Sequence, residues 1–228
     1  MNSPLLAVAL LLACAAASTP TVIQREGPRF LALGDSYTIG ERVDSASRWP
    51  VQLAAALRAR GVAIDDPEII ARTGWTTSEL AAGIDRADPK GPFALVTLLI
   101  GVNNQFRGRD AAEYDTQFRA LLDRAIGFAG NDPRRVVVVS IPDWGATPFA
   151  EGRDREKIGR EIDAFNAIAK RATIERLAHF VDITPESRNA ATDPELVAPD
   201  GLHPSAKMYG AWVGVMIGEV FGAVEKGS

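Results

Sequence analysis

Cysteine and histidine are scarce in this sequence, and clustered positive charge is missing. One cysteine among 228 residues excludes an internal disulfide framework and a cysteine-rich metal site. The two histidines, His179 and His203, are too few for a histidine-based metal centre, so we expect neither a metal nor a cofactor. The formal charge is −4 without any run of Lys and Arg. Nucleic acid is therefore not an expected partner, because phosphate binding needs clustered cations.

Long apolar runs are also missing, apart from one near the amino terminus. The run 5–17 is too short to span a membrane but is typical of the hydrophobic part of a secretory signal. Small residues follow it and predict cleavage, so we assign 1–19 to a signal peptide and 28–226 to one folded domain. The flank before the run carries no Lys or Arg, which leaves a buried amino-terminal helix as the alternative.

This leader predicts a secreted or periplasmic protein with no transmembrane span in its mature chain. The segment Leu11-Leu12-Ala13-Cys14 also resembles a bacterial lipoprotein signal, although Leu12 fits that pattern poorly. In that alternative Cys14 would carry a lipid anchor and hold the protein at a membrane surface. The sequence contains no signal for the oligomeric state.

The remaining chain has the composition of an α/β globule, with 46% apolar and 24% charged residues. Short apolar segments bounded by glycine and polar residues predict five strands, at 29–33, 68–71, 93–100, 136–139 and 179–183. Apolar residues at helical spacing predict helices in between and at the end, around 49–57, 76–84, 114–125, 158–172 and 212–220. This alternation predicts a parallel sheet covered on both faces, for which we favour the flavodoxin-like strand order 2-1-3-4-5. We expect a surface loop at 189–199.

Polar residues and glycines gather where the predicted strands end. Ser36 follows the first strand, Gly74 the second and Asn103 the third, and His203 comes after the fifth. Ligands of open α/β sheets bind at the carboxyl ends of the strands. We therefore expect these residues to meet on one rim of the sheet.

These residue types are the ones that acyl transfer requires. A serine hydroxyl becomes a nucleophile when a base takes its proton, and the imidazole of His203 can act as that base. Asp200 lies three residues before His203, so one turn of chain would let its carboxylate orient the ring. The backbone N–H groups of Ser36 and Gly74 and the side-chain amide of Asn103 can donate hydrogen bonds to the oxyanion.

Four sequence blocks, in this order, resemble those of the GDSL, or SGNH, hydrolases: Gly34-Asp35-Ser36-Tyr37, Gly74, Gly101-Val102-Asn103-Asn104 and Asp200-Gly201-Leu202-His203. The resemblance implies a three-layer αβα fold and a metal-free esterase, lipase, lysophospholipase or thioesterase. It also implies that Ser36 is the nucleophile, that Gly74 and Asn103 donate to the oxyanion, and that Asp200 and His203 complete the triad. Two positions depart from the family pattern, since Tyr37 replaces a leucine and Asn104 replaces an aspartate. Neither change removes a proposed catalytic atom.

The function that we predict is a serine ester hydrolase acting on a small-molecule carboxylic ester, with a short-chain acyl group, a lysophospholipid or a thioester as substrate. An O-acetyl esterase of polysaccharide or cell wall is one alternative, and a non-catalytic binding module on the same fold is another. We expect the acyl pocket to be lined by Trp75, Phe106 and Trp144.

Some of these residues have a competing interpretation. Ser36 could simply cap the helix that follows the first strand. Asp143 and Asp182 stand at strand ends and are alternatives to Asp200 as the carboxylate that orients the histidine.

Overall fold

The structure is a computed structural model, and it describes residues 28–225. The expected signal peptide and Cys14 lie outside the described residues. Five parallel strands form one sheet in the order β2-β1-β3-β4-β5, which confirms the predicted topology. The strands are β1 (Phe30–Asp35), β2 (Glu68–Arg72), β3 (Leu95–Leu99), β4 (Val136–Val139) and β5 (His179–Val181).

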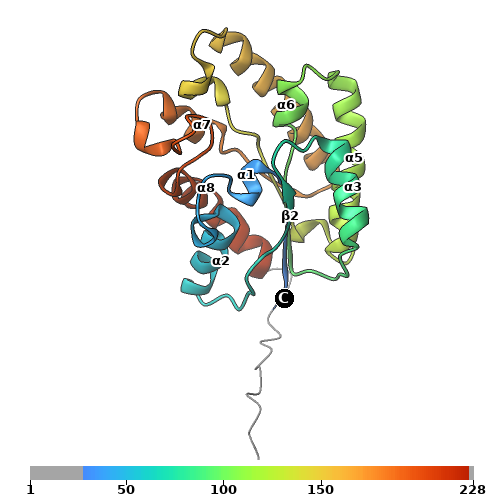
Figure 1. Cartoon of the computed structure of the whole chain (residues 1–228). Helices are drawn as coiled ribbons and strands as arrows, with labels where there is room; N and C mark the ends of the chain where they lie inside the picture. Colours follow the sequence, from blue (N-terminus) through green and yellow to red (C-terminus); the bar gives the residue numbers. More distant parts are fainter. Residues whose placement is uncertain (1–27, 226–228) are drawn as a thin grey trace, which may run out of the picture.

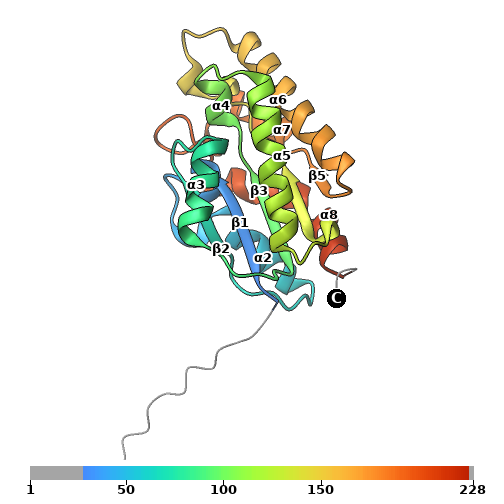
Figure 2. The same cartoon turned by 90° about the vertical axis from the view of Figure 1, so that its right-hand side faces the viewer.

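Helices cover both faces of the sheet, so the fold is a three-layer αβα sandwich (Figure 1). The helices α2 (Trp49–Ala59) and α8 (Ala206–Glu225) pack against each other on one face. The opposite face carries α3 (Thr77–Ala87), α5 (Ala111–Phe128) and α6 (Arg155–Glu175), which lie side by side in Figure 2. No helix within residues 28–225 is long and apolar enough to cross a lipid bilayer.

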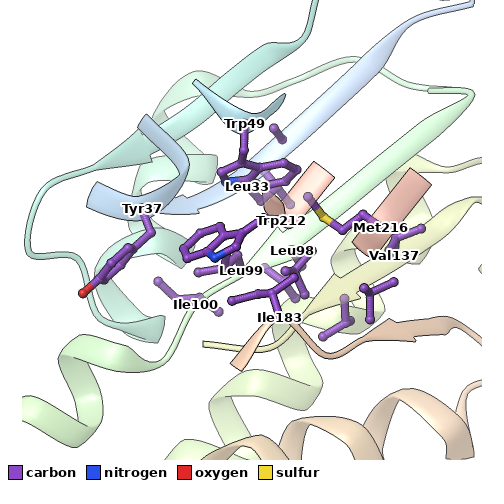
Figure 3. Close-up of a cluster of buried hydrophobic side chains, with 14 of the residues drawn as sticks. Leu33, Tyr37, Trp49, Leu98, Leu99, Ile100, Val137, Ile183, Trp212 and Met216 are labelled. Carbon is purple, nitrogen blue, oxygen red and sulfur yellow. The ribbon is translucent and has the colours of Figure 1, made fainter. Parts of the chain in front are cut away.

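The burial of the central strands explains why their sequences are almost continuously apolar. The residues of β1, β3 and β4 are buried along their whole length, because helices lie on both sides of them. On the face of α2 and α8, the core includes two large indoles, Trp49 and Trp212, both fully buried (Figure 3). Tyr37 lies at the edge of this cluster with its hydroxyl pointing away from it, which links the core to the rim of the sheet.

Local sequence signals account for several helix ends. Thr76 accepts a hydrogen bond from the backbone of Glu79, and Glu79 accepts one from the backbone of Thr76, so a capping box begins α3. Pro50 stands in the first turn of α2, where a missing N–H costs no hydrogen bond.

Short helical segments are absent from the sequence prediction. Three of them follow strands, namely α1 (Ser36–Ile39), α4 (Val102–Phe106) and α7 (Thr184–Ser187). The others are 3₁₀ turns in the connections, at Ser45–Ser47, Pro133–Arg135, Trp144–Ala146, Pro148–Ala150, Arg188–Ala191 and Pro194–Leu196. The expected surface loop 189–199 therefore contains two 3₁₀ turns, and it buries Ala190, Leu196 and Ala198. Val197 pairs with Pro204 in an antiparallel bridge, so this segment supports the turn that carries His203.

Candidate active site

Ser36 stands at the junction between β1 and α1. The carboxylate of Asp35 accepts a hydrogen bond from Tyr37 N–H at 3.0 Å and caps the helix, so the Ser36 hydroxyl is not the cap. Ser36 is the first helical residue, and its N–H therefore has no acceptor within the helix. A Cβ atom at Gly34 would lie 2.5 Å from the Leu99 carbonyl oxygen, so only glycine allows β3 to lie this close to the turn that carries Ser36.

Asp200 and His203 are joined by a compact turn. One carboxylate oxygen, Asp200 Oδ1, accepts the backbone N–H groups of Leu202 and His203, each at 3.0 Å. The other oxygen, Oδ2, lies 2.6 Å from His203 Nδ1. The turn is thus closed by the aspartate side chain itself rather than by a helical hydrogen bond, and it orients the imidazole so that Nε2 is the ring nitrogen left for chemistry.

The surroundings of Asp200 favour the ionised form of its carboxyl group. Partial burial opposes ionisation, but the hydrogen bonds from the His203 ring and from the backbone N–H groups outweigh it, so the pKa of Asp200 is lowered. Arg42 Nε lies 3.6 Å from Asp200 Oδ2, and Arg42 has a left-handed φ of 69°. The carboxylate is therefore charged at neutral pH and able to stabilise an imidazolium at His203.

Tyr37 packs against the imidazole, a contact that the sequence interpretation missed. The ring centroids of Tyr37 and His203 are 5.4 Å apart, and the Tyr37 ring also lies 6.3 Å from Trp212 of the core. The side chain that replaces the family's leucine thus holds the histidine from the side of the core. Its adjacency to Ser36 in the sequence was the only available signal.

Ser36 and His203 share the wall of one open pocket of about 180 Å³. Gly74 and Asn103 line the same pocket, so four of the five residues predicted for the triad and the oxyanion hole converge there. Within residues 28–225 the hydrogen bonds do not include one between Ser36 Oγ and His203; catalytic hydrogen bonds often tighten only when substrate binds. The complete lining is Ser36, Tyr37, Thr73, Gly74, Val102, Asn103, Phe106, Trp144, Phe149, Leu202 and His203.

The amide of Asn103 is engaged by protein acceptors. Its Nδ2 donates to the Trp75 carbonyl oxygen at 3.0 Å and to Asp35 Oδ2 at 3.4 Å. Burial raises the pKa of Asp35 to about 7, although the hydrogen bonds from Tyr37 N–H and Asn103 oppose the shift. Donation from Asn103 to an oxyanion therefore requires the long bond to Asp35 to be given up.

Asn104 braces the loop that carries Asn103. Its Oδ1 accepts the Thr77 backbone N–H at 3.0 Å, and its Nδ2 donates to Thr77 Oγ1 at 2.8 Å. These bonds tie α4, the short helix after β3, to the start of α3, and both residues are buried. A neutral amide does this with both a donor and an acceptor, whereas an ionised aspartate could only accept.

Some of the aromatic residues near the site line the pocket, and one packs against a helix instead. Phe106 and Trp144 line the pocket, as does Phe149. Trp75 does not, because its indole lies against α3, where a Cβ atom at Gly83 would come within 2.3 Å of the ring. Of the three aromatic residues predicted to line the acyl pocket, Phe106 and Trp144 thus line this pocket and Trp75 does not.

The alternative carboxylates have partners of their own. Asp143 Oδ2 accepts from Arg188 Nε at 2.9 Å, and Asp182 Oδ1 accepts from Ser140 Oγ at 3.0 Å. Neither forms a hydrogen bond with His203 among the described residues.

Comparison with known proteins agrees with the fold and the blocks described above. Residues 32–211 match the model of the GDSL-like lipase/acylhydrolase family, so the chain belongs to that family and is an ester-bond hydrolase. A search of curated proteins found no match.

Several solved structures share the fold at low sequence identity. TesA has a TM-score of 0.66 and 17% identity, over 84% of this chain and 97% of that one. The psychrotrophic esterase EstA from Pseudoalteromonas sp. has a TM-score of 0.61 and 18% identity, over 87% of this chain and 97% of that one. The acetylxylan esterase Axe2 from Geobacillus stearothermophilus has a TM-score of 0.63 and 19% identity, over 85% of this chain and 94% of that one.

Proposed function

We propose that the protein hydrolyses carboxylic esters of small molecules through an acyl-enzyme on Ser36. The observation that carries the proposal is the single pocket in which Ser36, Gly74, Asn103 and His203 meet. Asp200 forms a hydrogen bond with Nδ1 of the histidine. This arrangement supplies a nucleophile, a base with its orienting carboxylate, and donors for an oxyanion.

The reaction follows from these positions. Ser36 Oγ bonds to the acyl carbon while its proton moves to His203 Nε2, and the carbonyl oxygen becomes an oxyanion facing the N–H groups of Ser36 and Gly74. The carbon–oxygen bond to the alcohol then breaks, and the alcohol leaves with the proton from His203. Water repeats the sequence on the acyl-enzyme, which releases the carboxylic acid and restores Ser36.

A short acyl group suits the pocket best. Its volume of about 180 Å³ is below the roughly 300–1,000 Å³ of sites that enclose drug-sized ligands. We therefore favour short-chain esters over lysophospholipids. An O-acetyl ester of a saccharide is the second candidate, since such a substrate would place an acetyl group in the pocket and its sugar outside, near the exposed rings of Phe106 and Phe149.

We further propose that residues 28–226 form the mature catalytic domain and that 1–19 direct it to a secreted or periplasmic location. The apolar run 5–17 and the small residues after it support this assignment. The mass of the amino terminus of protein recovered from the culture medium or periplasm tests it, and also tests whether Cys14 is retained as a lipid anchor.

The test of the catalytic proposal is Ser36→Ala, measured with a series of 4-nitrophenyl esters of increasing acyl length. We expect kcat to fall by at least about a thousandfold while the melting temperature is unchanged, because the nucleophile is lost and its alanine replacement fits the same turn. Ser45→Ala is the matched control, since Ser45 lies in an exposed turn nearby. A fluorophosphonate should label the wild type and the control but not Ser36→Ala. Near-normal turnover by Ser36→Ala would remove Ser36 from the mechanism.

A further inference from the structure

Three aromatic side chains form a rim at one side of the catalytic pocket. Phe106, Trp144 and Phe149 come from α4 and the two 3₁₀ turns after β4, and their ring centroids lie 5.2–6.2 Å apart. Phe106 is 47% exposed and Phe149 is 38% exposed, although both are large and apolar. Exposed apolar surface beside a pocket is a common mark of a binding site.

The guanidinium of Arg153 lies over this aromatic rim. Its Cζ is 5.7 Å from the centroid of Phe106, 5.5 Å from that of Trp144 and 5.2 Å from that of Phe149. Contact with aromatic rings uses none of the N–H donors in a conventional hydrogen bond, and within residues 28–225 no protein acceptor takes one from the Arg153 side chain. Within residues 28–225 no carboxylate lies within ion-pair distance of Arg153.

A second open pocket, of about 360 Å³, adjoins the first across Phe106 and Trp144, which line both. Arg153 lines this second pocket together with Lys157, Asp154 and Glu161.

Three of these four charged side chains already have partners. Asp154 Oδ1 accepts the Lys157 backbone N–H at 2.9 Å, and Glu161 Oε2 accepts from Gln105 Nε2 at 2.8 Å. Lys157 Nζ lies 3.8 Å from Glu161 Oε1. Among the described residues that line this second pocket, Arg153 is therefore the cation without a carboxylate partner, and its guanidinium lies over the three rings.

We infer that the aromatic rim and Arg153 form a second subsite, which binds a carboxylate carried by the ester substrate beyond the reacting group. The inference rests on the proposed function, because it assigns the substrate class of the same site. The edge of a guanidinium matches a planar carboxylate with two parallel hydrogen bonds. A phosphate monoester carries about −1.5 to −2 charges at pH 7 and would meet stronger repulsion from Asp154 and Glu161. A singly charged carboxylate is therefore the favoured group.

The experiment compares substrates that differ in charge but hardly in shape. One pair places the carboxylate on the acyl side, mono-4-nitrophenyl succinate against 4-nitrophenyl butyrate. The other places it on the alcohol side, 4-acetoxybenzoate against 4-acetoxybenzamide. Each substrate is measured with the wild type, Arg153→Gln, Arg153→Lys and Arg160→Gln. Arg160 is the matched control, because it is an exposed arginine of α6 that does not line either pocket.

We expect Arg153→Gln to lower kcat/KM for the anionic member of one pair by about 3- to 20-fold, mainly through KM. This range corresponds to a partly exposed, charge-assisted hydrogen-bonded pair. The neutral members should stay within about twofold, Arg153→Lys should restore part of the preference, and 0.5 M NaCl should weaken it. Arg160→Gln should behave as the wild type.

Three results would overturn the subsite. The first is an equal loss for the neutral and anionic members, which would make Arg153 a packing residue of the rim. The second is a charge preference that Arg153→Gln leaves unchanged, and the third is the absence of any charge preference in the wild type. All three differ from a failure of the proposed function itself, in which no ester, neutral or anionic, would be hydrolysed in a manner that depends on Ser36.

Discussion

Replacing Asp200 with asparagine tests the orientation of the histidine with little change in shape. The asparagine Oδ1 can keep the two hydrogen bonds from Leu202 N–H and His203 N–H, both 3.0 Å long in the wild type, so the turn should survive. The amide NH₂ would replace Oδ2, which lies 2.6 Å from His203 Nδ1. Facing a donor, Nδ1 must become an acceptor, and the proton then sits on Nε2. A ring protonated on Nε2 cannot take the proton of Ser36.

The size of the effect follows from the exposure of Asp200. In a buried triad this substitution costs about 10⁴-fold in kcat. The Asp200 side chain here is 21% exposed, and water can offset part of the lost charge. We therefore expect a loss of about 10³-fold, which is about 4 kcal/mol of transition-state stabilisation. The free energy of unfolding should change by less than about 2 kcal/mol, because the backbone hydrogen bonds remain.

The assay is hydrolysis of 4-nitrophenyl acetate, with Ser36→Ala as the blank and urea unfolding as the stability measurement. Asp193→Asn is the matched control, since Asp193 also accepts a backbone N–H two residues on, from Glu195, but pairs with Lys207 rather than with a histidine. It should retain full activity. A kcat for Asp200→Asn within tenfold of the wild type would refute the role assigned to Asp200.

Two further predictions concern stability. Burial raises the pKa of Asp35 to about 7, so between pH 4 and 7 the native state holds a proton that the unfolded chain has lost. The contribution of this carboxyl to stability therefore falls as pH rises through that window. The Asp35→Asn variant can still cap α1 and stays neutral. Its free energy of unfolding in urea, relative to that of the wild type, should therefore rise by roughly 2–4 kcal/mol between pH 4.5 and pH 8, and a pH-independent difference would contradict the buried charge. Gly101→Ala should cost about 2–4 kcal/mol, because φ is +133° and the new Cβ would lie 2.7 Å from the Tyr114 ring. Gly108→Ala, at φ +62° with open space around it, should cost only about 1 kcal/mol, and equal losses for the two variants in the same assay would rule out the clash.

Local patterns were sufficient for the strands and the long helices. The four valines of β4 have the stiff, branched side chains that favour extended chain, and Thr76 and Glu79 carry both halves of a capping box. The short helices α1 and α4 have too few residues to show a periodicity, because a single turn depends on caps and tertiary contacts.

Side-chain direction was the part of the site that local patterns did not supply. Trp75 follows Gly74 directly, yet its indole turns to α3 because Gly83 leaves room for it there. Tyr37 contacts His203 only because distant parts of the chain meet at the edge of the core. The second pocket likewise arises between segments whose sequences carry no shared motif.

The sequence by itself determined the strands and long helices, their order along the chain, and the chemical groups at their ends, since propensity, capping and residue type act over a few neighbouring positions. The tertiary structure decided which of those groups share a pocket, because the carboxyl ends of parallel strands come to one edge only when the sheet is assembled. It also decided the burial of Asp35, the engagement of the Asn103 amide and the position of Arg153 over three rings. These properties depend on contacts between residues far apart in the chain, and only packing brings such residues together.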